Sequence, residues 1–177
     1  MKKLFTFAVF MMVISLGQNF AQKLGYTSAE AVLGQLPEAK TIEAELKAYT
    51  AQLTKEIESK QKEFQTKYQD YVANSTKMPV VVREQREKEL QTLKESMDEF
   101  QKKAQEGYQK KQQELLTPVF DKIQTAIDEI SKAESFDFIF NTDASGVPIL
   151  LYAKEEHNIT NKVITKLGGT PIVAPKN

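Results

Sequence analysis

The chain has 177 residues, with 24 Lys and Arg balanced by 24 Asp and Glu, no Cys and a mean hydropathy of −0.44. The equal charge count argues against a dedicated nucleic-acid binder, because phosphate affinity comes from a surplus of basic side chains. The lack of Cys excludes disulfides, thiolate metal sites, Cys nucleophiles and a lipid-anchored Cys.

Catalytic patterns are also absent from the sequence. It contains no Gly-rich phosphate loop, no G-x-S-x-G elbow and no H-E-x-x-H pair. Glu155, Glu156 and His157 could be imagined as a metal site, but there is no second His, so a solvated loop is the favoured interpretation. We therefore expect neither an enzyme nor a bound cofactor or metal.

Residues 1–21 have the layout of a secretory signal peptide. Lys2 and Lys3 precede an apolar run over residues 4–16, and cleavage is expected after Ala21. A permanent membrane anchor is the alternative, but an apolar run of about 13 residues is short for a bilayer span. Removal of the two lysines leaves 22 basic and 24 acidic residues, so the mature chain has a net charge of −2.

The mature chain begins with a segment, 22–36, that predicts a brief strand and a short helix. Leu24 and Tyr26 alternate with small or polar residues, which is typical of a strand. Thr27 and Glu30 have the spacing of a capping box, so the helix is expected to start beside Thr27. Pro37 ends it and begins a new helix, because proline cannot donate a helical hydrogen bond.

From residue 38 to about 72 the sequence predicts one long helix. It has no Gly or Pro there, and its apolar residues recur with a spacing that places Ile42, Leu53 and Phe64 eleven residues apart. Lys60 fills the one gap in this pattern. The apolar stripe is narrow and the rest of the surface carries interleaved charges, so we expect the stripe to be buried against a second helix.

That second helix follows a polar turn that ends in Pro79 and continues to about residue 133. Two long helices joined by a short turn form an antiparallel hairpin. We therefore expect a coiled-coil-like arm over residues 37–133, with its tip near residues 73–82. Gly107 and Pro118 interrupt the second helix and are candidate bends of the arm.

After residue 133 the hydrophobic period changes from 3.6 to 2. Three phenylalanines alternate there and predict a strand: Phe136, Phe138 and Phe140. Turn residues follow, then a second expected strand over 147–153, and a last helix that Gly168 and Gly169 end. Residues 170–177 are expected to form a flexible tail.

The fold class is therefore α+β and mostly α, with an arm that projects from a small β-rich base formed by residues 22–36 and 134–169. About fifty residues are marginal for an independent hydrophobic core, so we expect a homo-oligomer. The expected oligomer core consists of Leu24, Tyr26, Phe136, Phe138, Phe140, Ile149 and Leu151. A ligand platform on the phenylalanines is a weaker alternative.

Apolar residues of the arm are candidates for contact with a partner. They are Tyr68, Tyr71, Met78, Val80, Val81, Val82, Phe100 and Tyr108. A two-helix hairpin offers no obvious partner to the apolar residues at its tip, and a contiguous exposed apolar patch usually marks an interaction surface. For most of the aromatic residues, filling the seam between the two helices is the favoured interpretation; one that misses the seam would face a partner.

The order of these elements resembles the Skp (OmpH-like) periplasmic chaperone family over essentially the whole mature chain. Residues 119–127, leading into 136–140, look like the family's passage from the returning helix into its strand. The resemblance implies a homotrimer in the periplasm, with a small central barrel and arms around a cavity. It also implies an ATP-independent holdase for unfolded outer-membrane proteins, which meets the membrane only through these clients.

The chain departs from the best-known members of this family, which are strongly basic, because its mature net charge is −2. We therefore expect the capture of clients to depend less on salt than in those relatives. No lipopolysaccharide site is carried over to residues of this chain. The alternative function is a coiled-coil envelope scaffold or spacer that binds one folded partner.

Overall fold

The computed structural model describes residues 22–144 and 146–173. The expected export signal, 1–21, and its cleavage site after Ala21 lie outside these residues.

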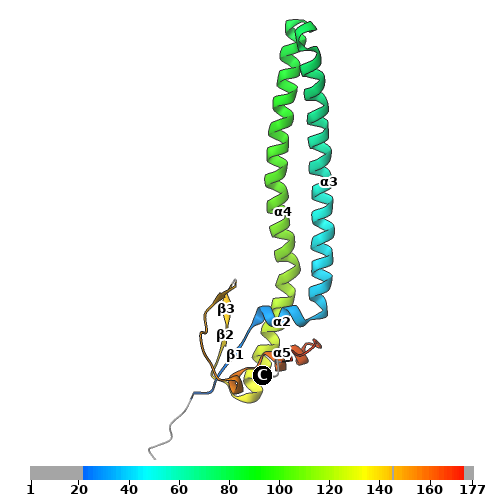
Figure 1. Cartoon of the computed structure of the whole chain (residues 1–177). Coiled ribbons are helices and arrows are strands. Elements are labelled where there is room, and N and C mark those ends of the chain that lie inside the picture. The colour runs from blue at the N-terminus through cyan, green and yellow to red at the C-terminus, as the bar shows by residue number, and fades with distance from the viewer. Residues whose placement is uncertain (1–21, 145, 174–177) are drawn as a thin grey trace, which may run out of the picture.

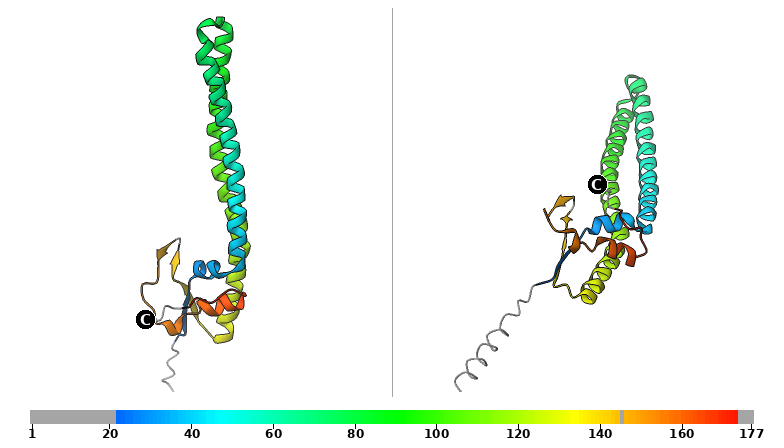
Figure 2. Two further views of the ribbon diagram at one scale, coloured as in Figure 1. Left: turned by 45° about the vertical axis from the view of Figure 1, so that its right-hand side comes forward. Right: turned by 60° about the horizontal axis from the view of Figure 1, so that its bottom comes forward.

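Two long helices form an antiparallel hairpin, which confirms the expected fold class (Figures 1 and 2). Helix α3 spans Pro37–Asn74, and helix α4 spans Val80–Glu134. A single turn of 3-10 helix, η1 (Ser75–Lys77), joins them at the far end. Pro37 is the first residue of α3 and Pro79 immediately precedes α4, positions where the missing amide hydrogen of proline costs no helical hydrogen bond.

Both ends of the described chain meet in the base, from which the hairpin projects. Its short elements are β1 (Leu24–Thr27), α2 (Ala29–Gln35), β2 (Phe138–Asn141), β3 (Asp143–Ala144), β4 (Val147–Pro148), η2 (Glu155–His157) and α5 (Thr160–Lys166). Strand β1 pairs in parallel with β2, so that Leu24 lies opposite Phe138. Strands β3 and β4 form a separate antiparallel pair. The parallel pairing unites segments that are more than one hundred residues apart in the sequence.

The hydrophobic core lies where α2, α5 and the base end of α4 meet. Val32, Ile123, Ile159, Val163 and Ile164 are each 0–1% exposed there. Helix α4 therefore belongs to both parts of the molecule: its first half forms the arm, and its last turns contribute to the core of the base.

The start of α2 differs from the expected capping box. The N-cap is Ser28, whose hydroxyl accepts a hydrogen bond from the amide of Ala31 at 3.0 Å. Thr27 is instead the last residue of β1, and its buried hydroxyl donates to Thr160 Oγ1 at 3.2 Å. Pairing of β1 with β2 holds Thr27 in the strand, so the helix begins one residue later.

The second expected strand, 147–153, is much shorter than predicted. Only Val147 and Pro148 form a strand, and the following Ile149 and Leu150 donate their amides to the carbonyl of Thr142. Residues 149–153 have strand-like composition but no neighbouring strand to pair with in the described chain. A strand needs a partner, which local sequence pattern does not supply.

The phenylalanine segment forms the expected strand β2, but its side chains have different surroundings. Phe136 packs against the chain's own core, whereas Phe138 and Phe140 stack on each other, with ring centroids 6.4 Å apart, and remain about half exposed. Ile139, on the opposite face, is the strand residue that packs against the core. The strand begins only at Phe138, and Phe136 packs on the side of Ile139, so the expectation that all three phenylalanines share one face is wrong. The face formed by Phe138 and Phe140 is not covered within one chain.

The end of the chain is more ordered than expected. The flexible tail was placed at 170–177, yet Thr170 donates its amide to the carbonyl of Gln35 and Ile172 is bonded to Asn161. Residues 170–173 thus belong to the folded base, and residues 174–177 lie outside the described part of the chain.

Candidate functional site

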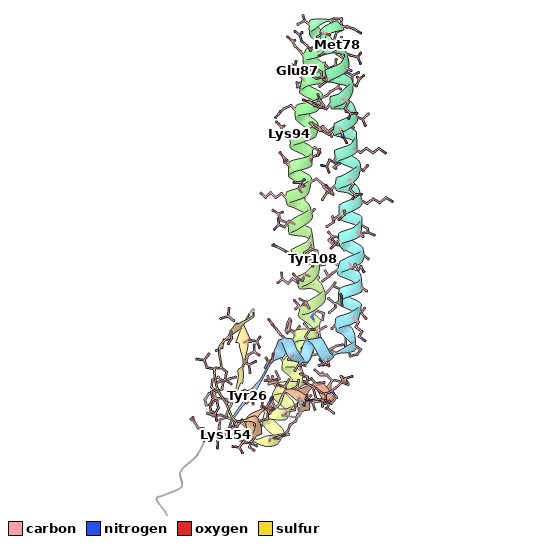
Figure 3. The ribbon with its side chains drawn as sticks, in the orientation of Figure 1. Tyr26, Met78, Glu87, Lys94, Tyr108 and Lys154 are labelled. Carbon is pink, nitrogen blue, oxygen red and sulfur yellow. The ribbon has the colours of Figure 1, made fainter. Side chains whose placement is uncertain are left out.

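The seam of the arm buries its apolar stripe only in part. Ile42 is buried at the root of α3 and Ala104 is buried midway along α4, while Phe100 and Tyr108 are half-buried between the helices (Figure 3). The ammonium of Lys60, the residue that fills the gap in the apolar pattern, lies 5.5 Å from the centroid of the Phe100 ring. This cation–π contact lets a charged residue occupy the seam.

The two candidate bends lie within an uninterrupted helix, because α4 continues through both Gly107 and Pro118. Gly107 has a packing role: a Cβ atom at this position would lie 2.7 Å from the hydroxyl oxygen of Tyr49. The glycine therefore allows α3 and α4 to approach closely. Bending of the arm at either residue stays a prediction.

The tip of the arm carries exposed apolar side chains. We use the name tip patch for Tyr68, Val72, Val80, Val81 and Val82, which are all exposed in the last turns of α3 and the first turn of α4. Val81 is the most exposed, at 74%. Exposure of apolar side chains to water is unfavourable. A group of them at the end of an arm is therefore typical of an interaction surface.

Two other predicted contact residues at the tip are half-buried. Met78 lies just before α4, and Tyr71 donates a hydrogen bond from its phenol to the carboxylate of Glu87 (Figure 3). This hydrogen bond, together with partial desolvation, raises the pKa of Tyr71. Tyr71 therefore joins the two helices near the tip, whereas Tyr68 is half exposed and stacks on Phe64, with ring centroids 6.0 Å apart.

The outer surface of the arm is covered by short-range ion pairs. Lys103 lies 2.7 Å from Glu99, one helical turn away, and Arg86 lies 2.9 Å from Glu89. The hydrogen bond from Lys103 lowers the pKa of Glu99, so this carboxylate stays charged. Such pairs make the outside of the arm polar but leave it without a large charge of one sign.

The base carries a second exposed apolar surface. We use the name base face for Leu24, Phe138, Phe140, Val147, Ile149, Leu151 and Tyr152, all of which are exposed. Leu151 is 89% exposed and Phe138 is 52% exposed. Five of the seven residues expected in an oligomer core belong to this face.

The other two residues expected in the oligomer core, Tyr26 and Phe136, make contacts within their own chain. The phenol of Tyr26 donates to the carboxylate of Glu155 at 3.1 Å, and the ammonium of Lys23 lies 4.2 Å from the centroid of the Phe136 ring.

Sequence reasoning missed three residues of the tip patch and the base face: Val72, Val147 and Tyr152. Val72 directly follows the seam residue Tyr71, so the helical period predicts that Val72 lies outside the apolar stripe. Val147 and Tyr152 fall in the segment 147–153, for which the sequence predicts a regular strand. Within the described chain, residues 149–153 pair with no other strand.

The described residues offer no site for a metal or a membrane span. Within 22–144 and 146–173 there is no group of three or more side chains that could bind a metal ion. In the same part of the chain, no helix is long and apolar enough to cross a membrane. His157 is the exposed last residue of η2, and its Nε2 atom lies 3.6 Å from a carboxylate oxygen of Glu156.

Comparison with known proteins identifies the family. Residues 23–167 match the sequence model of the family described as outer membrane protein (OmpH-like), so the chain belongs to this family, that of the Skp chaperones. The chaperone protein Skp of Photorhabdus laumondii subsp. laumondii is 25% identical over 172 residues, which cover 94% of this chain and 99% of that protein. Skp of Photorhabdus luminescens shows the same identity and coverage.

A solved structure has the same fold. A putative outer membrane chaperone (OmpH-like) from Caulobacter crescentus CB15 superposes with a TM-score of 0.69 at 18% identity, covering 82% of this chain and 83% of the other. The family and the two Skp proteins support a chaperone role for this chain. Proteins of the family are chaperones and not enzymes, as expected from the sequence.

Proposed function

We propose that this chain is an ATP-independent periplasmic holdase that acts as a homotrimer and binds unfolded outer-membrane β-barrel proteins between its arms. The observation that carries the proposal is the pair of exposed apolar surfaces, one at the tip of a long arm and one on the base. The base face serves self-association, and the arms with their tip patch serve the clients.

Self-association follows from the exposure of the base face. Seven apolar side chains, among them the stacked pair Phe138 and Phe140, face solvent in a single chain. Removing apolar surface from water contributes roughly 25 cal/mol per Å², so contact between copies of this face is favourable. Strand-like residues 149–153, which lack a neighbour in one chain, would gain one in the assembly.

Light scattering tests the assembly. The mature protein is expected to have three times the mass of one chain, and Phe138→Glu is expected to shift it to the monomer, because the charge would be buried in the interface. Val81→Glu is the matched control, since it places the same charge on an exposed apolar residue at the arm tip. A wild-type protein that runs as a monomer would refute self-association.

Capture of clients needs no deep pocket. An unfolded protein offers apolar segments in no fixed order, and several arms around one cavity supply many weak contacts. Their effects combine through effective concentration. Each contact is weak enough for the client to leave without ATP.

The decisive experiment dilutes a urea-unfolded outer-membrane β-barrel protein into buffer with the mature chain. Aggregation, followed by turbidity, should be suppressed at a fixed ratio of client to trimer. Replacing Val80, Val81 and Val82 together by Ser should weaken suppression without loss of helix in circular dichroism, because these side chains are exposed. Replacing Thr50, Thr54 and Gln101 by Ser on the exposed surface midway along the arm is the control.

Failure of the wild-type chain to suppress aggregation would contradict the holdase. Stoichiometric capture of one folded envelope protein would instead support the scaffold function. The salt dependence distinguishes capture through charges from capture through apolar contacts. With a mature net charge of −2, suppression of aggregation should change little as salt is raised from low to physiological concentration. A steep loss would mean that charges dominate capture.

Export is tested on the same protein. Expression of the full chain should place it in the periplasm, with Gln22 as the first residue after cleavage behind Ala21. N-terminal sequencing of the periplasmic protein checks the cleavage site.

A further inference from the structure

The described chain continues beyond the part that matches the family. The match ends at residue 167, and residues 168–173, which we name the C-terminal strap, follow helix α5. The amide of Gly168 donates to Thr165 at 3.1 Å and that of Gly169 donates to Ile164 at 2.9 Å. With Gly168 at a φ of 78°, this is a Schellman motif, which turns the chain sharply at the end of a helix.

After this turn the strap lies on the corner between α2 and α3. Leu36 is the residue shared by the two helices, and it is almost completely buried. Thr170 donates its amide to the carbonyl of Gln35, the last residue of α2, at 3.3 Å. The strap thus binds the point from which α3 leaves the base (Figure 1).

Gly169 makes this close approach possible. A Cβ atom on Gly169 would lie 2.7 Å from the carbonyl oxygen of Gln35, 2.9 Å from Ile164 Cγ2 and 3.1 Å from Leu36 Cδ2. Backbone and two buried side chains surround the position, so a larger residue would lift the strap from the corner.

The outer end of the strap is held by one side chain of α5. The carboxamide of Asn161 accepts a hydrogen bond from the amide of Ile172 at 2.8 Å and donates one to the carbonyl of Ile172 at 2.9 Å. Asn161 therefore pairs with the strap as a neighbouring strand would. Anchored at both ends, the strap connects α5 to the α2–α3 corner.

The corner matters because the two arm helices enter the base differently. Helix α4 continues into the core without a break, whereas α3 is joined to α2 at Leu36 and contributes Ile42, at its root, to the core. The ammonium of Lys122, one turn after Pro118, lies 3.2 Å from the carboxylate of Glu38 in the first turn of α3. A bend of α4 at this level must therefore move the root of α3 against the base.

We propose that the C-terminal strap restrains the α2–α3 corner and thereby limits movement of the arm against the base. The restraint is mechanical and goes beyond the proposed function, because it holds whether or not the arms bind unfolded clients. Asn161→Ala removes the two side-chain hydrogen bonds to Ile172 without touching the core, since Asn161 is exposed. Removal of residues 168–177 is the stronger variant.

Hydrogen exchange reads the corner directly. The amides of Leu36 and Ala39, which donate to Leu33 and Leu36, should exchange faster in Asn161→Ala, on the order of tenfold for the loss of two hydrogen bonds. The amides of β1 and β2 should keep their rates. Gly34→Ala is the control, because a Cβ there meets nothing within 4 Å, and it should not speed exchange at the corner.

Arm movement is measured by the distance between two spin labels. Because the chain has no Cys, Gln52→Cys on α3 and Lys154→Cys in the base can be labelled cleanly and mixed with excess unlabelled protein. Both strap variants should broaden the distance distribution. Unchanged corner exchange and an unchanged distribution in Asn161→Ala would overturn the proposal even if the truncated chain fails to fold. Faster exchange throughout the base would also overturn it, because the strap would then be a general stabiliser.

Discussion

The arm and the base are stabilised in different ways. The core of the base contains side chains that are 0–1% exposed, from α2, α4 and α5. Along the arm, α3 buries only Ile42, at its root, and Ala104 is the buried residue of α4 midway to the tip. The base therefore derives its stability from complete burial, whereas the arm combines helix formation with a seam that is only half-buried.

Polar contacts follow the same division. On the arm many of them are local, as in the pair Lys103 and Glu99, one helical turn apart, although Lys111 and Glu45 also join the two helices at 3.3 Å. In the base they connect distant segments: the amide of Lys23 donates to the carboxylate of Asp137, 114 residues away. A part held largely by local contacts can bend or fray without unfolding the rest.

Truncation of a core residue should produce the largest effect. Ile164→Ala in α5 should lower the free energy of unfolding by about 2 to 5 kcal/mol, because the side chain is fully buried. Leu53→Ala in the half-buried seam should cost about 1 kcal/mol. Urea unfolding followed by circular dichroism at one fixed protein concentration measures both. Equal costs would break the comparison between base and arm.

Pro118→Ala should have the next largest effect. It restores an amide donor inside α4 and removes the clash of the proline ring, so the helix should gain about 1 to 3 kcal/mol. The arm should also stiffen, which small-angle scattering would detect as a narrower range of shapes. Pro79→Ala, just before the helix, is the control and should change little. Unchanged arm mobility in Pro118→Ala would argue against a bend at this residue.

Ser135→Gly should stabilise the exit from α4 by about 0.5 to 1 kcal/mol. Ser135 has a φ of 56°, a left-handed conformation that costs every residue but glycine steric energy. Thermal unfolding at constant protein concentration measures the gain. Ser135→Ala keeps the Cβ atom and should show no such gain, so a similar rise in both variants would point to a cause other than backbone conformation.

The smallest effect concerns pH and Glu134. Lys162 donates to both carboxylate oxygens, at 2.6 and 2.8 Å, and these hydrogen bonds hold the pKa of Glu134 below its usual range. A lowered pKa means that the stabilisation is fully present above the ordinary pKa of Glu and is lost as pH falls through the folded value. The urea midpoint of the wild type should exceed that of Glu134→Gln near neutral pH.

At a pH well below the folded pKa of Glu134, the two midpoints should converge. A difference that persists in acid would mean that Gln disturbs packing and not charge. Glu99→Gln on the arm is the matched control, since its partner Lys103 is local and exposed.

Much of the arm could be predicted from the sequence because its information is local. The helix expected from residue 38 to about 72 is α3, and the apolar residues Leu53 and Phe64 face the seam as their spacing indicated. The candidate contact residues were less predictable. Phe100 and Tyr108 are half-buried, while Tyr68 is half exposed, and the apolar spacing along the sequence does not separate these outcomes.

The base could be outlined but not assembled from the sequence. The sequence predicts its strands and last helix close to their observed positions. The N-cap of α2 is nevertheless Ser28 and not Thr27, because Thr27 belongs to β1 and pairs with Asn141 of β2. The strand expected over 147–153 is short for the same kind of reason: its partner is not encoded nearby.

The sequence by itself determined the long hairpin, its narrow seam, the lack of catalytic motifs and a small base formed by both ends of the chain. These properties follow from composition and from helical periods, which act over a few residues. Only the tertiary structure decided that β1 lies parallel to β2, that the phenylalanine face stays open, and that residues 170–173 bind the α2–α3 corner. Each of these depends on contacts between segments far apart in the chain, whose energies no local pattern records.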